Sequence, residues 1–262
     1  MTRSVAVIGS GPGGMYIAQG LIDKLPGCRV DVIDKLPSPF GLIRFGVAPD
    51  HQTTKRVSRA FAKTLQSDGV RFLGNVEVGR DASIEELQSI YDAVVLAYGA
   101  PYDNHLGIPG EDKKNVFGSN AFVGWYNCHP EFLDLNPDLD VKAAAVIGLG
   151  NVAVDVARVL AKTKKEMSIT DLAPYAGEAI EASPIEDIHI FGRRGPIEGA
   201  FTNVELREMG RLENCAPILD AAQLPDSVVA PHLSERDLRL RTKNVETLRS
   251  FLDVSPEGKD KR

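Results

Sequence analysis

Cysteine is scarce in this chain. Its 262 residues include only Cys28, Cys128 and Cys215, which lie far apart and form no Cys-x-x-Cys pair. This spacing excludes a redox-active dithiol, and it offers no cysteine-ligated zinc or iron–sulfur site. The scarcity also predicts a reduced, intracellular protein, because disulfide frameworks belong to oxidising compartments.

Long apolar runs and an excess of positive charge are missing as well. No apolar run approaches the roughly 20 residues that span a bilayer. The 36 acidic and 30 basic residues give a net charge of −6, which argues against nucleic acid as the main partner. The remaining composition, 43% hydrophobic and 25% charged residues, is typical of an ordered soluble protein. The length is sufficient for two modest cores.

Two glycine-rich turns are the most informative feature of the sequence. The first is Gly9-Ser10-Gly11-Pro12-Gly13-Gly14, and the second is Gly148-Leu149-Gly150-Asn151-Val152-Ala153; each follows a short apolar run. Each predicts a strand, a tight turn and a helix, the arrangement that sets a pyrophosphate on a helix N-terminus. One such motif is weak evidence, but two in the right context predict two dinucleotide sites.

The residues downstream of the two turns differ in sign. Asp34 ends the next apolar run after the first turn, where a carboxylate accepts hydrogen bonds from ribose hydroxyls and repels a phosphate. Arg193 and Arg194 end the corresponding run after the second turn, and paired guanidinium groups match a 2′-phosphate. The first site is therefore predicted to hold a non-phosphorylated adenosine, as in FAD, and the second NADP(H). The alternative for the two arginines is a solvated basic turn.

The spacing between Gly150 and Arg193 is longer than usual for such a unit. It predicts a surface insertion around residues 162–184.

Another apolar run, residues 91–100, ends in Tyr98-Gly99-Ala100. Small residues at the end of a strand let the backbone pack closely against a ligand. The run therefore predicts a strand beside the first cofactor, or simply a buried parallel strand.

Several long strings extend these motifs. The longest is Leu-Pro-Ser-Pro-Phe-Gly-Leu-Ile-Arg-Phe-Gly-Val-Ala-Pro-Asp-His at residues 36–51. The others are residues 74–79, 122–127, 150–158, 192–196, 200–202 and 205–208. On these strings, which are spread over residues 4–210, the chain resembles the NADPH:adrenodoxin (ferredoxin) oxidoreductase family.

The resemblance implies an α/β fold with two Rossmann-like dinucleotide-binding domains built on parallel sheets. It implies a flavoprotein that transfers a hydride from NADPH to FAD and then single electrons to a ferredoxin- or adrenodoxin-type iron–sulfur protein. The expected domains are residues 1–108 (the N-terminal part of the FAD domain), 109–254 (an incomplete NADP domain) and a charged tail, 255–262. The expected FAD contacts are Gly9, Gly11, Gly13, Gly14, Asp34, Leu42 and Val78. The expected NADP contacts are Gly148, Leu149, Gly150, Asn151, Val152, Arg193, Arg194 and Glu205.

The C-terminal part departs from the family pattern. Family members return to the FAD domain with a Gly-Trp-x-x-x-Gly-Pro-x-Gly stretch, and nothing resembling it follows Ala200. We therefore expect an FAD domain without its C-terminal return segment and a tail without strand character. Two functions stay open: a working reductase, and a shortened remnant that binds NADP(H) with weak or no reductase activity. The small subunit type of glutamate synthase is a less favoured third, because this chain lacks its usual cysteine-rich cluster.

Within the family motifs, His51 and Asp155 are the candidates for a polar relay beside the flavin. The alternative is a capping turn at His51 and a solvent-facing Asp155. An acidic ferredoxin predicts a basic docking face. Its candidate residues are Arg207, Arg211, Arg236, Arg239 and Arg241. Leu238 and Leu240 alternate with two of these arginines, which predicts a strand or an amphipathic edge; an ordinary solvated stretch is the alternative.

The family's eukaryotic members suggest a mitochondrial-matrix protein. The first predicted strand begins almost at the N-terminus and leaves no visible transit peptide. A bacterial origin would predict the cytoplasm instead.

Overall fold

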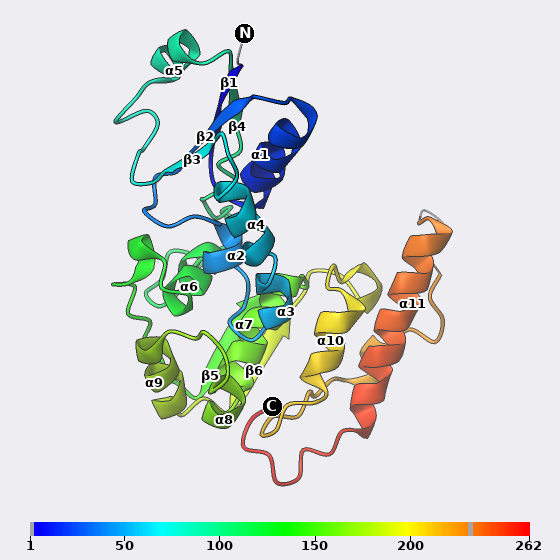
Figure 1. Cartoon of the computed structure of the whole chain (residues 1–262). Helices are drawn as coiled ribbons and strands as arrows, with labels where there is room; N and C mark the ends of the chain where they lie inside the picture. The colour runs from blue at the N-terminus through cyan, green and yellow to red at the C-terminus, as the bar shows by residue number, and fades with distance from the viewer. Residues whose placement is uncertain (1–2, 230–232) are drawn as a thin grey trace. The chain divides into compact units, whose positions relative to one another are not determined.

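The computed structural model describes residues 3–229 and 233–262 and divides into two compact units (Figure 1). Unit 1 comprises Met1–Glu111 and Asn127–Leu133, and unit 2 comprises Asp112–Tyr126 and Asp134–Arg262. The segment Asn127–Leu133 thus joins unit 1, although the sequence scheme assigned it to the second domain. None of the helices within the described ranges has the length and apolar character to cross a membrane.

Unit 1 is built on a sheet of four parallel strands in the order β3-β2-β1-β4. The strands are β1 Ser4–Ile8, β2 Arg29–Ile33, β3 Val70–Leu73 and β4 Ala93–Leu96. The strand order reverses at β1, because β2 and β3 lie on one side of it and β4 on the other. In open parallel sheets, ligands bind at such a reversal, beyond the carboxyl ends of the strands.

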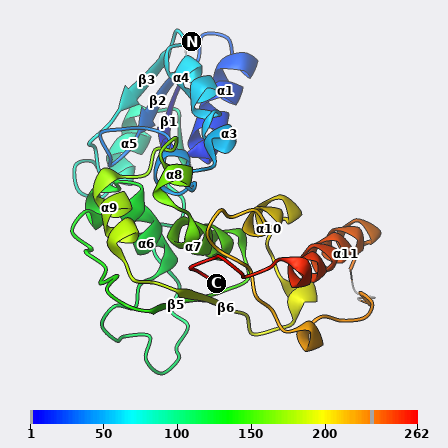
Figure 2. The ribbon, with the colours of Figure 1, turned by 90° about the horizontal axis from the view of Figure 1, so that it is seen from below.

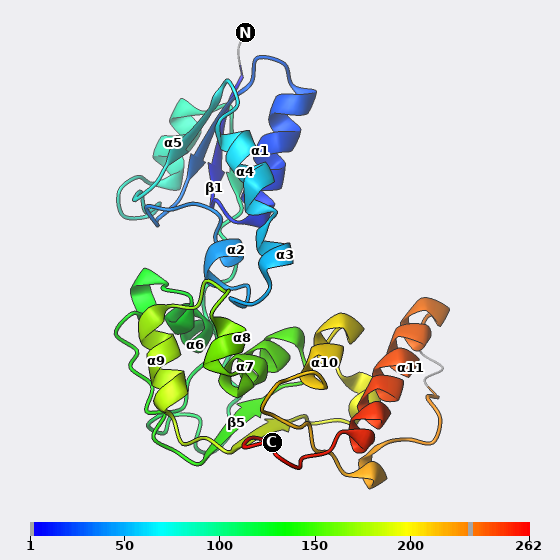
Figure 3. The same cartoon turned by 60° about the horizontal axis from the view of Figure 1, so that its bottom comes forward.

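Helices cover both faces of this sheet, with α5 on one face and α1 and α4 on the other (Figure 3). Alternate residues of β1 face opposite ways: Val5 and Val7 join the core cluster that contains Met15 of α1, whereas Ile8 packs with Leu87 of α5. The helices are α1 Pro12–Lys24, α2 Leu42–Phe45, α3 Gln52–Lys55, α4 Ser58–Leu65, α5 Ile84–Ile90 and η1 Pro130–Phe132. Unit 1 is therefore a layered α/β unit.

Unit 2 has two parallel strands, β5 Ala143–Ile147 and β6 Asp187–Phe191. Its core lies between α7 and α10 and includes Ala157, Leu206 and Phe251. The helices are α6 Ser119–Tyr126, α7 Asn151–Ala161, α8 Lys164–Met167, α9 Pro174–Ala182, η2 Pro196–Glu198, α10 Asn203–Met209, η3 Ala221–Gln223, α11 Glu235–Ser250 and η4 Phe251–Asp253. The predicted α/β class with parallel sheets is confirmed.

The segment with alternating leucines and arginines was predicted as a strand or an edge, and this prediction is wrong. It forms the first half of α11, and Ser234 caps the helix by accepting a hydrogen bond from the backbone N–H of Asp237 at 3.1 Å. The alternation of Leu238 and Leu240 covers too few residues to set a period. Val245, buried seven residues after Leu238, continues a helical spacing instead.

The predicted surface insertion forms α8 and α9. Ala176 and Ile180 of α9 are buried, and Tyr175 donates a hydrogen bond to the carbonyl of Trp125 at 2.5 Å. The insertion is therefore packed into unit 2 instead of lying loosely on its surface.

The charged tail also differs from expectation, because its last two residues pair with neighbouring backbone (Figure 2). The N–H of Arg262 donates to the carbonyl of Glu186 at 2.9 Å, and its carbonyl accepts from Ile188 at 2.7 Å. Lys261 and Cys215 form an isolated parallel β-bridge through their backbones. Residues 261–262 thus connect β6 to the segment around Cys215 through backbone hydrogen bonds. The pattern of apolar and polar side chains in the sequence does not predict such bonds.

A buried carboxylate ties two strands of unit 1, β2 and β3, to the residue that ends α5. Asp31 of β2 is 5% exposed and accepts hydrogen bonds from Arg71 Nε at 2.7 Å and from Tyr91 Oη at 2.7 Å. Burial alone would raise the pKa of Asp31, but the hydrogen bonds from Arg71 and Tyr91 outweigh it and lower the pKa. Burial, together with the bond to Asp31, raises the pKa of Tyr91 to about 12.

We therefore expect Asp31→Asn to lower the free energy of unfolding by about 2 kcal/mol near neutral pH, because the charged acceptor of the hydrogen bonds from Arg71 and Tyr91 is lost. The folded-state pKa of Asp31 lies below its unfolded-state value. The contribution is thus present above about pH 4 and disappears as the pH falls through the folded-state pKa. Denaturant titrations of both proteins across this range measure it, with Tyr91→Phe as a milder comparison. A stability difference that stayed constant down to strongly acidic pH would contradict the assignment.

Candidate functional site

The first glycine-rich turn depends on two close backbone approaches. Gly9 has φ +105°, and a Cβ there would lie 2.4 Å from the carbonyl oxygen of Ala97, just beyond β4. A Cβ on Gly14 would lie 1.9 Å from the carbonyl oxygen of Gly9. Only glycine fits at these positions, so the chain passes from β1 into α1 within a few residues. The first turn of α1 carries no acidic side chain, and its N–H groups lack intrahelical partners.

Asp34 is fixed at this turn by hydrogen bonds from protein donors. Its Oδ2 accepts from the backbone N–H of Ser10 at 2.8 Å and from the Ser10 hydroxyl at 2.5 Å, while Oδ1 accepts from Leu36 N–H at 2.9 Å. Ser10 has no exposed surface, and its carbonyl accepts from Phe40 N–H at 3.1 Å. The structure therefore brings Asp34 and the segment before Leu42 to the first turn. The sequence reasoning did not single out Ser10, which connects them.

The other predicted residues of unit 1 occupy different settings. Leu42 opens α2 and is 63% exposed. Val78 packs against the core cluster that contains Ile33 and Leu87. His51 is half-buried at the position before α3, where its side chain does not cap the helix. The backbone of His51 does form the turn that leads into α3, since its carbonyl accepts from Lys55 N–H at 3.1 Å. The relay role of His51 and the alternative of a capping turn at Asp50 and His51 both stay predictions.

The second glycine-rich turn is held by the segment that follows η2. The carbonyl of Leu149 accepts hydrogen bonds from Ala200 N–H at 2.6 Å and Phe201 N–H at 3.2 Å. The Asn151 side chain accepts from Thr202 N–H at 2.7 Å. Because α10 begins immediately after Thr202, its first turn starts at the glycine-rich turn.

Arg193 and Arg194 follow β6 and are exposed. Gly148 N–H donates to the carbonyl of Phe191 at 2.8 Å, which brings the end of β6 to the start of the turn. The turn is thus flanked by the two arginines on the β6 side and by α10 on the other. Val152, in the first turn of α7, is 48% exposed.

Asp155 and Glu205 meet at a buried arginine that the sequence reasoning missed. Arg158 of α7 has no exposed side-chain surface. Its Nη2 lies 2.9 Å from Asp155 Oδ1, its Nη1 lies 3.5 Å from Glu205 Oε2, and its Nε lies 3.4 Å from Glu208 Oε2. Asp155 is 14% exposed, so the solvent-facing alternative for it does not hold. The predicted pairing of Asp155 with His51 joins residues of two different units and stays a prediction.

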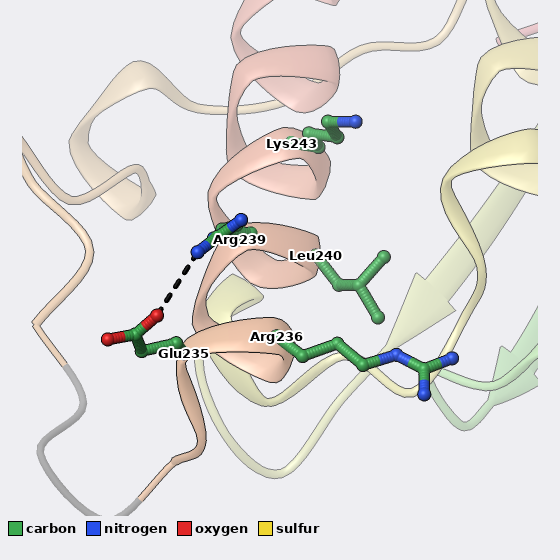
Figure 4. A pocket seen from close by; sticks show the side chains of 5 residues that line it. All are labelled: Glu235, Arg236, Arg239, Leu240 and Lys243. Carbon is green, nitrogen blue, oxygen red and sulfur yellow. Dashed lines mark hydrogen bonds and ion pairs between the residues drawn. The ribbon is translucent and has the colours of Figure 1, made fainter.

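The candidate docking arginines lie on α10, just after it, and on α11. Arg207, Arg211, Arg236 and Arg239 are exposed, and Arg241 is partly buried. On α11, a groove of about 420 Å³ is lined by Glu235, Arg236, Arg239, Leu240 and Lys243 (Figure 4). Arg239 pairs with Glu235 at 3.1 Å. Helical spacing therefore adds Lys243 and Leu240 to the face that carries Arg236 and Arg239.

All three cysteines are free; Cys28 and Cys215 are buried and Cys128 is exposed. Burial raises the pKa of the Cys215 thiol, which disfavours the reactive thiolate. The cysteines therefore contribute no dithiol to either site.

Comparisons with known proteins agree with this arrangement. The family model of the pyridine nucleotide-disulphide oxidoreductases matches residues 3–188. The NADPH:adrenodoxin oxidoreductase of Bos taurus is 48% identical over 221 residues, which cover 84% of this chain and 45% of the bovine protein. The NADPH-ferredoxin reductase FprA of Mycobacterium leprae is 39% identical over 98% of this chain and 57% of that protein.

A solved structure of FprA from Mycobacterium tuberculosis, in complex with NADPH, matches the whole chain with a TM-score of 0.91 at 38% identity. The match covers 58% of that chain. This chain thus spans about half the length of the curated relatives it matches. With the family model covering most of its residues and two strand–turn–helix units in the structure, the chain belongs to the pyridine nucleotide-disulphide oxidoreductase family.

Proposed function

We propose that this chain carries the nucleotide-binding part of an NADPH-dependent flavoprotein that reduces a ferredoxin-type iron–sulfur protein. One observation carries the proposal. Two glycine-rich turns are followed by side chains of opposite charge, a carboxylate at Asp34 and two guanidinium groups at Arg193 and Arg194. A carboxylate after the first turn favours a nucleotide without a 2′-phosphate, and guanidinium groups after the second favour one that carries it.

The names of the relatives support this proposal. The bovine relative is an NADPH:adrenodoxin oxidoreductase, and the mycobacterial relative is an NADPH-ferredoxin reductase. This chain spans only about half of each relative. The relatives' activity and partners are therefore part of the proposal for this chain. Relatives of both mitochondrial and bacterial origin match. We propose the matrix for a eukaryotic source and the cytoplasm for a bacterial one.

The first site fits the adenosine and pyrophosphate of FAD. Among the residues that the structure describes, no group apart from chain neighbours and the helix's own backbone lies within 4 Å of where a Cβ on Gly11 or Gly13 would be. The amino end of α1 is therefore open there, and helix N-termini attract a diphosphate through their N–H groups. Asp34 is held in place by Ser10, and its remaining lone pairs can accept hydrogen bonds from ribose hydroxyls. Leu42 and Val78 are proposed as apolar contacts.

The second site fits NADP(H) in a definite orientation. Arg193 and Arg194 offer planar donor forks to the 2′-phosphate on the β6 side of the turn. Glu205, in the first turn of α10, cannot favour a phosphate, because like charges repel. A carboxylate there fits the neutral and cationic groups at the other end of the ligand: the ribose hydroxyls, the carboxamide and the nicotinamide ring.

When bound, the two cofactors supply hydride transfer and single-electron transfer, and the protein supplies position and exclusion of water. His51 and Asp155 are proposed as polar groups beside the flavin. Arg207, Arg211, Arg236, Arg239 and Arg241 are proposed as the docking face for an acidic partner. The groove on α11, with Arg236 and Lys243 along it, supports this proposal by offering a recess beside positive charge.

The direct test is the visible spectrum of the chain purified without added flavin. We expect oxidised-flavin bands that bleach on addition of NADPH, because both nucleotide turns are present. Bleaching under anaerobic conditions with NADPH, but much less with NADH, would be the supporting result. A colourless protein that still binds NADPH would instead favour the remnant with weak or no reductase activity.

Removing the two guanidinium groups should change the nucleotide preference. In Arg193→Ala with Arg194→Ala, we expect the Kd for NADP+ to rise about 30-fold, as two charge-assisted contacts are lost, and the Kd for NAD+ to stay the same. Isothermal titration calorimetry measures both constants. Arg211→Ala, which removes an exposed arginine from the same unit, serves as the control. An equal loss for both nucleotides would favour the solvated basic turn.

Charge reversal on α11 should weaken binding of an acidic ferredoxin. For Arg236→Glu, we expect the Kd to rise about tenfold at low salt, and the salt dependence of binding to become shallower. Lys114→Glu, in the loop before α6, makes the same charge change on another part of unit 2. If the two variants lose equal affinity, net charge and not the α11 face governs binding. NADP+ affinity, measured in parallel, should not change in either variant.

A further inference from the structure

The cluster around Arg158 joins two helices that both begin at the second glycine-rich turn. Asp155 lies on the same helix as Arg158, whereas Glu205 and Glu208 lie on α10. The guanidinium reaches all three carboxylates with three different nitrogens. It is completely buried, while its partners are between 14% and 37% exposed. The positive charge is therefore in the interior, and the carboxylates around it reach towards the surface.

The cluster is positioned to act on the nucleotide turn. The start of α7 is the turn itself, and Asn151 and Leu149 hold the three residues that lead into α10. Glu205 lies in the first turn of α10. The ion pair of 3.5 Å between Arg158 Nη1 and Glu205 Oε2 therefore links α7 to the Glu205 carboxylate at the point where both helices leave the turn.

Resting on the proposed NADP(H) site, we infer that Arg158 is a positioning residue for the nicotinamide end of the ligand. It acts through Glu205 and Asp155, whose carboxylates it holds, and does not itself contact the 2′-phosphate. The charges support this division. Arg193 and Arg194 provide the positive groups for the phosphorylated adenosine, whereas Glu205, which pairs with Arg158, offers a carboxylate that suits hydroxyl, amide and cationic groups.

The planar guanidinium is the necessary feature, because it presents donors in several directions from one fixed plane. A lysine at the same position would keep the charge but offer a single ammonium, which cannot serve carboxylates on two helices in the same way. A purely structural role of Arg158 would have a different consequence. Weakening its ion pairs would then disturb the binding of both ends of the nucleotide. The two roles are therefore separable by ligands that contain one end of NADP+ or both.

The test compares Arg158→Lys with the wild-type chain by isothermal titration calorimetry, using NADP+ and 2′,5′-ADP, which lacks the nicotinamide mononucleotide half of NADP+. We expect the Kd for NADP+ to rise about tenfold and the Kd for 2′,5′-ADP to change less than about twofold. Arg262→Lys, which makes the same replacement in an arginine paired with Asp187 at 2.7 Å, should change neither constant. Circular dichroism and thermal unfolding establish that each variant is folded.

A double-mutant cycle tests whether Arg158 acts through Glu205. Glu205→Gln alone should weaken NADP+ binding by a similar factor, and the combination with Arg158→Lys should bind NADP+ no more weakly than the weaker single variant. Additive losses would overturn the mechanism, because the two residues would then act independently.

Two other results would overturn the inference. Equal losses for NADP+ and 2′,5′-ADP in Arg158→Lys would make Arg158 a brace for the whole site, and no loss for either would leave it without a part in binding. If Arg158→Lys does not fold, the same ligand comparison with Glu205→Gln and Asp155→Asn decides, because equal losses for both ligands there also overturn the inference. A wild-type chain that bound neither ligand would remove the proposed NADP(H) site itself, which is a separate failure.

Discussion

The carbonyl oxygen of Gly9 lies where a side chain on Gly14 would have to be, and this contact sets the geometry of the first site. Because the backbone can close there, β1 passes directly into α1, and Ser10 is held where its hydroxyl and N–H both reach Asp34. The second turn is less tight. Ala153 takes the place of the third glycine, and a Cβ on Gly148 would lie an ordinary 3.8 Å from its methyl group. Both turns therefore connect a strand to a helix, but only the first depends on a backbone approach too close for any side chain.

Hydrogen bonds divide the charged groups of the two sites into two kinds. Asp34 is already bound by three protein donors, so a ligand would complete a carboxylate whose orientation is fixed. Arg193 and Arg194 are exposed on the loop after β6. A prearranged carboxylate favours affinity for ribose hydroxyls, because little ordering remains to be done when the ligand binds. Charge-assisted bonds to a phosphate can offset the side-chain entropy lost when exposed arginines are ordered.

The strands and both glycine-rich turns could be predicted, because their signals lie within a few neighbouring residues. Arg158 could not be assigned a role, since its partners Glu205 and Glu208 become neighbours only when α10 packs on α7. The Leu–Arg alternation on α11 misled for the opposite reason: four residues fit a strand, and the helical period appears only when Ser234 and Val245 are included. The pairing of Arg262 with β6 depends on backbone groups, which every residue carries.

Family membership by itself leaves the electron acceptor open. A family named for disulphide chemistry includes a route through a pair of cysteines, but the cysteines here are free, and the buried thiol of Cys215 has a raised pKa. Under the function proposed above, electrons would leave a bound flavin directly to a partner that docks on the surface. The identity of that partner then depends on surface charge. In that proposal, the groove along α11, where Arg236, Arg239 and Lys243 lie beside Glu235, is the candidate docking surface.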